Sequence, residues 1–490
     1  MADRNVSSES QGFEPDAAVA AGGTREPDAG DSPVAPSAPD STCSADSVPS
    51  CWQAAVGSSR GAMPEQISGD CRVGTCACGE DGGCGACTDA LGPPVVTPAR
   101  AQTWISAWSG RGPLSTTITT DRTFTDPTPN LSQSTLRVMA HVTAGGSQVR
   151  VRFSQRFTSS ALDVGAAHVA IRDSGNAIVP DTDRELTFGG ASQVTVPAGA
   201  DIWSDPIDLN VSAASDLAIS VYIPGPFTPT TEGGRGQIKT SYHGAGNQVS
   251  AASLSSAATT RQVFVVYEVQ VLSPDPAATI VALGDSITEG ACSTLDADGD
   301  WPDLLANRLL LDGNARAIFN AGIGSGRFAS SDAAGLRGLY RLDELLTLPA
   351  VAWVMILMGV NDISYERVDA AFLQDAFGQA ILAAHRAGKR IIGIPILPFG
   401  HSVKDVGNNV QIAREVNEWI RAHDKRLGAS EPSYDAVIDL EDIVRDPTDS
   451  GWALLPELSC DGVHPNQAGY RAIANAIPLD LFREAPVLSP

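Results

Sequence analysis

Residues 281–290 read "VALGDSITEG", and the interpretation of the whole chain depends on this stretch. Its first three residues are apolar, as in a buried strand, and a glycine, an acid and a hydroxyl follow at once. Gly290 supplies a second turn signal six positions after the first glycine. Two interpretations of the turn are open. Either Asp285 or Ser286 caps a helix, or Ser286 is held out as a nucleophile.

The segments after residue 276 predict an α/β fold with a parallel sheet. Continuous apolar runs alternate with helical stretches, which is typical of strands that are covered on both faces. The runs read "TIVAL", "AIFN", "VAWVMILMG", "RIIGIPIL" and "AVIDL", and the helical stretches include "WPDLLANRLLL" and "NQAGYRAIANAI". In such a sheet, ligands bind at the carboxyl ends of the strands.

Polar and small residues follow three of these strands, and a further pair precedes the last helix. Each short string is common in turns, and a single histidine is more often structural than catalytic. All four in order are hard to obtain by accident and predict a functional site. The groups are Gly284-Asp285-Ser286, Asn320-Ala321-Gly322, Gly359-Val360-Asn361-Asp362, and Asp461 three residues before His464.

On these blocks, residues 278–480 resemble the SGNH (GDSL-type) hydrolase family. The resemblance implies a three-layer α/β/α domain. The family's Ser, Gly, Asn and His blocks match Ser286, Gly322, Asn361 and His464. The tight glycine spacing in "NAGIGSGRF" leaves open whether Gly322 or Gly324 is the matching glycine, and we favour the first. The elbow "GDSIT" also differs from the G-x-S-x-G of α/β-hydrolases, which argues against that fold.

The chemistry of these residues is that of a serine nucleophile. A serine hydroxyl attacks poorly until a base takes its proton, and His464 is placed to act as that base. Asp461 can accept from the imidazole and fix its tautomer. The family pattern implies an oxyanion hole of the Ser286 and Gly322 N–H groups and the Asn361 amide. No metal or organic cofactor is expected.

We therefore expect a serine esterase or lipase-type hydrolase that cleaves O-acyl esters through an acyl-enzyme. Two alternatives stay open. The chain could be a glycan-binding module with the hydrolase domain as a scaffold, although the intact set of candidate residues counts against it. It could also be an acyltransferase, which would use the same residues and differ in the exclusion of water. The sequence does not identify the acyl group or the alcohol.

Composition and pattern divide the chain into three segments. Residues 1–98 are rich in small and polar residues and predict a disordered, Cys-containing tail. Residues 99–275 alternate with period two and predict an antiparallel β-sandwich, as in "QVRVRF", "LAISVYI" and "VFVVYEVQV". This sandwich resembles the β-domain that precedes the catalytic domain in one bacterial branch of the family. Residues 276–490 form the predicted catalytic domain.

The pattern places particular residues on the core side of the sandwich, including Val149, Val151, Phe153 and Tyr267. "SPDPAA" at 273–278 is interpreted as a linker, so the sandwich has few reasons to depend on the catalytic domain.

Charge and apolar patterning exclude some partners. The formal net charge of −24 makes binding to nucleic acid or an anionic membrane unfavourable. The strongly apolar run 351–360 is half as long as a membrane-spanning helix, so no membrane span is expected. A small-molecule or polysaccharide ester is the expected partner, and no oligomeric state is predicted.

Cysteine usage suggests export. Seven of the nine cysteines lie between Cys43 and Cys87, which suits an oxidising compartment, although no signal peptide is visible. We expect a secreted or cell-surface protein. In the tail, "CRVGTCACGEDGGCGAC" matches no familiar zinc spacing, so local disulfides or free thiols are favoured.

Three further features are weaker candidates for a metal site, a substrate contact and a disulfide. The acidic run 296–300 lacks the glycine and the last acid of a calcium loop, and a solvated acidic loop is favoured. His401 is expected in a loop near the site, where it could touch substrate. Cys292 and Cys460 either form a disulfide across the cleft or are free buried thiols.

Overall fold

The computed structural model of the chain describes residues 101–110, 129–156, 158–227, 239–274, 278–330 and 337–483. The predicted tail of residues 1–98, with its seven cysteines, lies outside these ranges. Contacts within the chain group Pro93–Pro490 into one compact unit. The boundary between the sandwich and the catalytic domain therefore stays a prediction.

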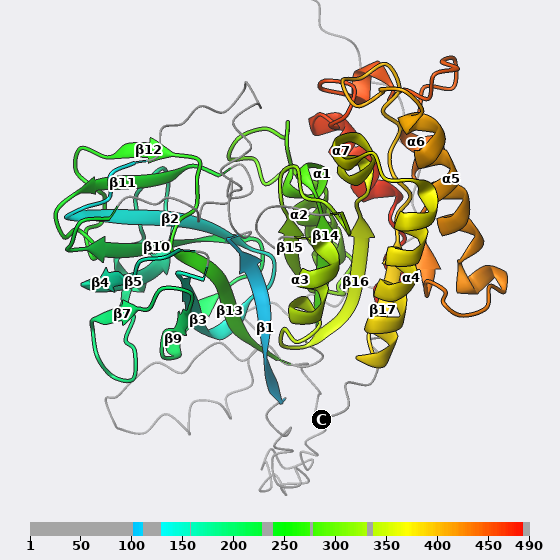
Figure 1. Ribbon diagram of the computed structural model, residues 1–490. Coiled ribbons are helices and arrows are strands. Elements are labelled where there is room, and N and C mark those ends of the chain that lie inside the picture. Colours follow the sequence, from blue (N-terminus) through cyan, green and yellow to red (C-terminus); the bar gives the residue numbers. More distant parts are fainter. Residues whose placement is uncertain are drawn as a thin grey trace, which may run out of the picture. The chain divides into compact units, whose positions relative to one another are not determined.

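The first half of this unit consists of antiparallel sheets, which confirms the predicted β-rich region (Figure 1). One sheet has the order β1 (Gln102–Ser109), β13 (Val266–Pro274), β3 (Gly146–Ser154) and β8 (Asp201–Trp203), with β9 (Ile207–Val211) also on β3. The other has the order β12 (Ala258–Thr260), β11 (Ser241–Ala245), β2 (Ser134–Val142), β10 (Ser215–Ile223), β5 (Ala166–Ile171) and β6 (Arg184–Glu185). A short pair consists of β4 (Leu162–Val164) and β7 (Val194–Val196).

Most of the predicted inward residues of these strands lie in the shared core. Val149, Val151 and Phe153 of β3 are fully buried there. Tyr267 was predicted on the same side, and that prediction is wrong. The ladder between β13 and β3 shifts register between Val266 and Glu268, so Val266 enters the core in its place. The predicted linker is also shorter, because β13 continues to Pro274.

The second half is the predicted α/β/α domain, with one parallel sheet. Its order is β15 (Ala317–Gly322), β14 (Thr279–Gly284), β16 (Val351–Leu357), β17 (Arg390–Gly393) and β18 (Ala436–Val437). The last two strands are shorter than their apolar runs. The helices are α1 (Ser286–Glu289), α2 (Trp301–Leu311), α3 (Gly338–Leu345), α4 (Ala370–Arg386), α5 (Asn409–Ala422), α6 (Glu441–Val444) and α7 (Gln467–Ala476). Short helical turns are η2 (Pro180–Thr182), η4 (Asp362–Glu366), η5 (Lys425–Leu427), η6 (Pro456–Leu458) and η7 (Leu479–Phe482).

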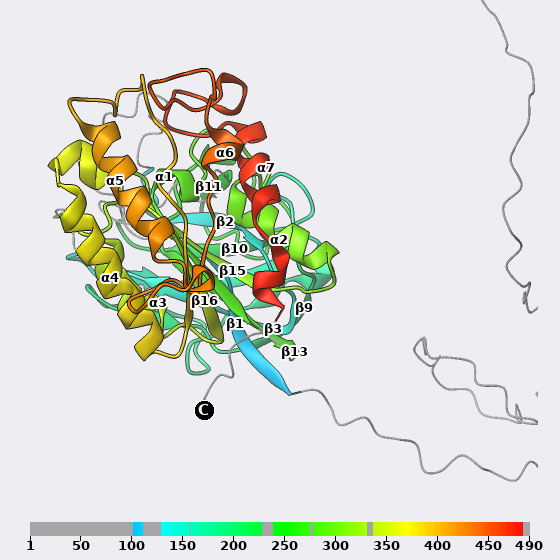
Figure 2. The same cartoon turned by 90° about the vertical axis from the view of Figure 1, so that its right-hand side faces the viewer.

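Successive residues of β14 pack on opposite faces of this sheet. Val281 and Leu283 belong to a core with residues of α3, α4 and α5. Ile280 and Ala282 belong to a second core with residues of α2, α6 and α7. Figure 2 shows α4 and α5 on one side of the sheet and α2 and α7 on the other. Both faces are therefore covered, as continuous apolar strands require.

The edge strand β15 is hydrogen-bonded to the sandwich. The Ile318 N–H donates to Thr143 Oγ1 at 2.8 Å, and the Ser109 hydroxyl donates to the carbonyl oxygen of Asn320. These contacts are buried, so water cannot replace them without cost. The sandwich is thus hydrogen-bonded directly to the parallel sheet, which its alternating pattern and the predicted linker did not indicate.

The acidic run 296–300 is also tied to the sandwich. Lys239 Nζ lies 2.6 Å from Asp298 Oδ2, and the Thr240 N–H donates to Asp296 Oδ1 at 2.7 Å. Asp300 instead caps α2. Asp296 is exposed, as expected of a solvated loop. The expectation is wrong for Asp298, which lies against the buried Lys239, and for Asp300, which is itself buried.

Within the described ranges, the chain has no helix with the length and apolar character needed to cross a membrane.

We predict that Thr143→Val destabilises the protein by about 1–3 kcal/mol, because the Ile318 N–H would be left buried without its acceptor. Thr143→Ser keeps the hydroxyl and loses one methyl group, which costs about 1 kcal/mol or less. Chemical denaturation of the three proteins measures the difference. Equal stability of Thr143→Val and the wild type would show that this contact contributes nothing.

Candidate active site

The serine of the elbow sits at the first position of a short helix. β14 ends at Gly284, and the Asp285 carboxylate accepts from the Ile287 N–H at 3.0 Å as the cap of α1. A Cβ at Gly284 would collide with the Thr288 side chain, so only glycine lets α1 start this close to the strand. Asp285 therefore caps the helix and Ser286 follows it, half-buried, at the carboxyl end of the sheet.

The structure brings Ser286, His464 and Asp461 together in one hydrogen-bonded chain. Ser286 Oγ lies 2.8 Å from His464 Nε2, although 178 positions separate them in sequence. His464 Nδ1 lies 2.8 Å from Asp461 Oδ2. An ionised carboxylate only accepts, so Nδ1 carries the proton and Nε2 is free to accept from the serine hydroxyl.

Asp461 is held in the ionised form that this arrangement needs. Its second oxygen accepts from the Val463 N–H at 2.9 Å and the His464 N–H at 2.8 Å. Burial alone would raise the pKa of Asp461, but the hydrogen bond and charge of His464 hold that pKa well below its usual range. The carboxylate is therefore ionised at neutral pH.

The loop after α1 is fastened to the turn that carries the histidine. Cys292 and Cys460 form a disulfide, with 6.3 Å between their Cα atoms. Gln467, at the start of α7, accepts from the Thr294 N–H and donates to the Gly299 carbonyl oxygen, both at 3.0 Å. Of the two states left open for these cysteines, the structure has the bonded one.

Asn361 follows β16 at the same end of the sheet. Its side chain is 2% exposed. Nδ2 donates to the Gly326 carbonyl oxygen at 3.0 Å, and Oδ1 accepts from Lys404 Nζ at 3.0 Å. An Nδ2 group has two hydrogens, so one remains for a ligand after the bond to Gly326.

The two candidate glycines differ in their hydrogen bonds. The Gly322 N–H donates to Asn320 Oδ1 at 3.0 Å and is buried. The Gly324 N–H is half-buried, and in the part of the chain that the structure describes it donates to no acceptor. Gly322 instead makes room for α1, because a Cβ there would collide with the Glu289 backbone nitrogen.

Asp362 shapes a neighbouring loop. Its carboxylate is fully buried and accepts three backbone bonds of 2.7 to 2.9 Å, from the N–H groups of Phe328, Ala329 and Ser330. These bonds occupy both oxygens, so the Asp362 carboxylate orders the segment 328–330.

In the loop of residues 400–408, Lys404 contacts a candidate site residue, whereas the expected residue was His401. His401 is 67% exposed, and its Nε2 pairs with Asp449 at 2.8 Å. Lys404 of the same loop reaches Asn361. Sequence reasoning missed Lys404, because a single lysine in a loop carries no motif.

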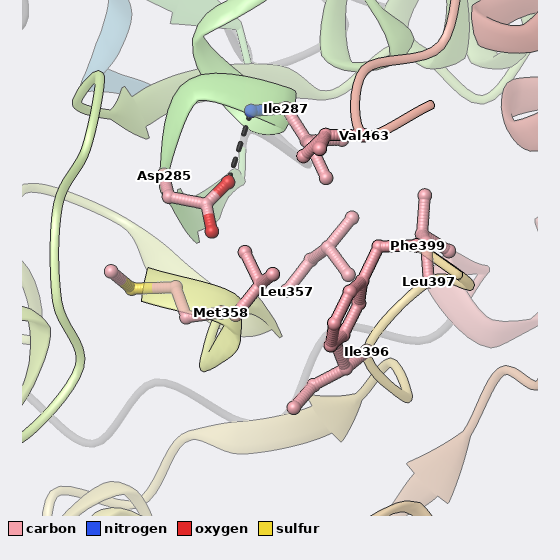
Figure 3. A pocket seen from close by; sticks show the side chains of 9 residues that line it. Asp285, Ile287, Leu357, Met358, Ile396, Leu397, Phe399 and Val463 are labelled. Carbon is pink, nitrogen blue, oxygen red and sulfur yellow. Dashed lines mark hydrogen bonds between the residues drawn. The ribbon is translucent and has the colours of Figure 1, made fainter. Parts of the chain in front are cut away.

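Asp285 borders a small apolar cavity of about 10 Å³, large enough for about one water molecule. Figure 3 shows its carboxylate beside Met358 and Leu357, with Ile396, Phe399 and Val463 across the cavity. Burial among these groups raises the pKa of Asp285 to about 6, in spite of the hydrogen bond from Ile287.

Comparisons with known proteins identify the same region. The GDSL-like lipase/acylhydrolase family matches residues 282–472. Among solved structures, a carbohydrate acetylesterase from Sinorhizobium meliloti is 17% identical, with 42% of this chain and 97% of that chain covered and a TM-score of 0.33. The inhibitor-bound aryl esterase of M. smegmatis is also 17% identical, with 41% and 96% covered and a TM-score of 0.32.

No curated protein sequence matches this chain. Identity to the solved structures is low, so the family assignment depends on the match over residues 282–472.

We predict that ionisation of Asp285 destabilises the protein as pH rises. The folded pKa of about 6 lies above the ordinary value of 3.8, so the stabilisation is full below pH 4 and is lost as pH rises through 6. The loss is on the order of 3 kcal/mol. Asp285→Asn keeps an oxygen for the Ile287 N–H and should lack this loss.

Guanidinium unfolding midpoints of both proteins, compared between about pH 4 and pH 8, measure the effect. Parallel pH profiles would mean that Asp285 does not titrate with a raised pKa.

Proposed function

Because residues 282–472 belong to the GDSL-like lipase/acylhydrolase family, we propose that Ser286, His464 and Asp461 are the catalytic triad of a serine esterase. The family makes the chain a carboxylic ester hydrolase. The observation that supports the triad is the unbroken chain of two 2.8 Å contacts from the Ser286 hydroxyl through the imidazole to Asp461.

In the proposed first step, Ser286 Oγ attacks the ester carbonyl carbon while His464 Nε2 takes the hydroxyl proton. The imidazolium that forms is stabilised by the adjacent Asp461 carboxylate. The low pKa of Asp461 supports this role, because the carboxylate stays charged instead of taking the proton itself. His464 then gives its proton to the leaving alcohol, and the acyl group remains on Ser286.

The tetrahedral intermediate needs donors for its negative oxygen. We propose the Ser286 N–H, which precedes the hydrogen-bonded part of α1, and the Nδ2 group of Asn361. For the third donor we propose the Gly324 N–H in place of Gly322, because the Gly322 N–H is given to Asn320. One such donor contributes on the order of 3 kcal/mol to transition-state stabilisation.

Water completes the cycle in the proposed mechanism. His464 removes a proton from water, the resulting hydroxide attacks the acyl carbon, and Ser286 leaves with the proton that His464 returns. The substrate we propose is an O-acyl ester of a small molecule or carbohydrate.

We propose that the sandwich is a structural part of the esterase. Ser106, Glu268 and Gln270 of its β1–β13 sheet are at most 1% exposed, although they are polar. The adjoining Arg152 and Arg156 form ion pairs with Glu344 of α3, the first at 3.3 Å. This side of the sheet thus lies against the catalytic domain, which leaves it little surface for a glycan.

We propose that the protein works in an oxidising compartment. The bond between Cys292 and Cys460 would be reduced in most cytosols. It joins the two loops that flank the triad, so the site depends on it directly.

We predict that Ser286→Ala lowers the rate of ester hydrolysis at least a hundredfold and leaves the melting temperature nearly unchanged, because the half-buried hydroxyl carries no core packing. His464→Ala should give a similar loss. Initial rates on p-nitrophenyl esters from acetyl to palmitoyl, and on acetylated polysaccharides, test the triad and define the acyl and alcohol preferences. Activity of Ser286→Ala above about a hundredth of wild type would exclude the proposed nucleophile.

We predict that Asn361→Ala lowers kcat by about 10²–10³ with little change in KM, because its donor matters chiefly when charge develops on the oxyanion. Steady-state kinetics on a soluble p-nitrophenyl ester separate the two constants. A loss confined to KM would instead make Asn361 a ground-state binding residue.

A further inference from the structure

Lys404 is a half-buried cation beside the proposed oxyanion hole. Its Nζ lies 3.0 Å from Asn361 Oδ1 and 3.5 Å from the centre of the Tyr365 ring. Neither contact is an ion pair with a carboxylate. The ammonium of Lys404 thus donates a hydrogen bond to the Asn361 amide and lies against the face of the Tyr365 ring.

The partners of Asn361 fix which way its amide points. A lysine ammonium can only donate, so the atom that it contacts must be the amide oxygen. A backbone carbonyl can only accept, so the atom next to Gly326 must be the amide nitrogen. With both contacts present, the reversed amide would place two donors together and two acceptors together. Among the residues that the structure describes, removing Lys404 leaves only the bond to Gly326 to hold the orientation of the amide.

We propose that Lys404 is a positioning residue of the esterase, which holds the Asn361 amide with Nδ2 available to the developing oxyanion. This inference rests on the proposed function, since it needs Asn361 to be an oxyanion donor. Lys404 itself would not touch the substrate. The ammonium also draws electron density toward Oδ1, which makes the Nδ2 hydrogens better donors.

The loop that carries Lys404 is ordered by its own hydrogen bonds. The Lys404 N–H donates to Ser402 Oγ at 3.1 Å, and its carbonyl oxygen accepts from Asn409 Nδ2 at 2.8 Å. The His401 N–H donates to Asp405 Oδ2 at 2.9 Å. These bonds place the Lys404 backbone before any ligand arrives, so little entropy remains to be lost when the site acts.

Tyr365 also contacts the ammonium of Lys404 and supports the same arrangement. Burial raises the pKa of Tyr365, but the hydrogen bond and charge of Lys404, together with Ser325, lower it overall. The face of the Tyr365 ring thus makes a favourable cation–π contact with the ammonium. Tyr365 is itself 50% exposed, so its contact with Lys404 is not required by core packing.

The test is steady-state kinetics of Lys404→Met, which keeps the length of the side chain and removes the donor. We expect kcat to fall about tenfold while KM changes less than about twofold. Lys404→Arg restores a cationic donor and should stay within about threefold of the wild-type kcat. Lys425→Met, a change at a lysine that is 55% exposed and pairs at 3.8 Å with Glu431, controls for the loss of one positive charge.

A double-mutant cycle shows whether Lys404 acts through Asn361. On the Asn361→Ala background, adding Lys404→Met should lower kcat by less than about twofold. An undiminished tenfold loss there would overturn the positioning role, because the lysine would act on the reaction without Asn361. Wild-type kcat in Lys404→Met, or a loss confined to KM, would overturn it as well.

The cycle also separates this inference from the proposed function. If Asn361→Ala lowers kcat and Lys404→Met does not, only the role of Lys404 fails. If Asn361→Ala leaves kcat unchanged, the oxyanion role of Asn361 fails and the role of Lys404 fails with it. Melting temperatures of all variants identify any that lose activity by unfolding. If Lys404→Met unfolds, the kcat of Lys404→Arg tests the role of the lysine instead.

Discussion

The arrangement of the site depends on how closely α1 can follow β14. The chain turns from strand to helix at Gly284, where a side chain would occupy the space of Thr288. At Gly322 on the neighbouring strand, a side chain would occupy the space of the Glu289 backbone. With side chains at these two positions, α1 would lie farther from the sheet. Ser286 would then not reach the imidazole of His464, which is 178 residues away in sequence. The two glycines therefore contribute to the site because they have no side chain, which allows α1 to pack close to the sheet.

Much of this architecture could be predicted because it depends on local periodicity. Residues of β3 alternate as those of half-buried strands do, and β14 and β16 are buried throughout, as strands between two helical layers are. The strand-end rule then brought Ser286 and Asn361 to one region, and the family resemblance added His464, which precedes the last helix, and gave all three their expected roles. Each inference uses a property that a short window of sequence contains.

The features that were missed depend on contacts between distant segments. The register shift in β13 moved Tyr267 out of the core. The alternating pattern of a sequence does not indicate where such a β-bulge occurs. The bond between the Gly322 N–H and Asn320 Oδ1, on which the proposal of Gly324 as a donor rests, also has no signal in the sequence. Lys404 met Asn361 because two loops after different strands come together, and the spacing of 43 residues has no meaning in the sequence itself.

The contacts of Thr143 and Ser109 with β15 have a further consequence for the solution behaviour of the domain. An edge strand whose N–H and C=O groups are free can add a strand from another molecule. In this protein the polar groups of Ile318 and Asn320 are already bonded to the sandwich. By occupying these groups, the sandwich prevents a strand of another molecule from pairing with β15. A catalytic domain separated from it would be prone to aggregate through β15 even where its sheet stayed folded.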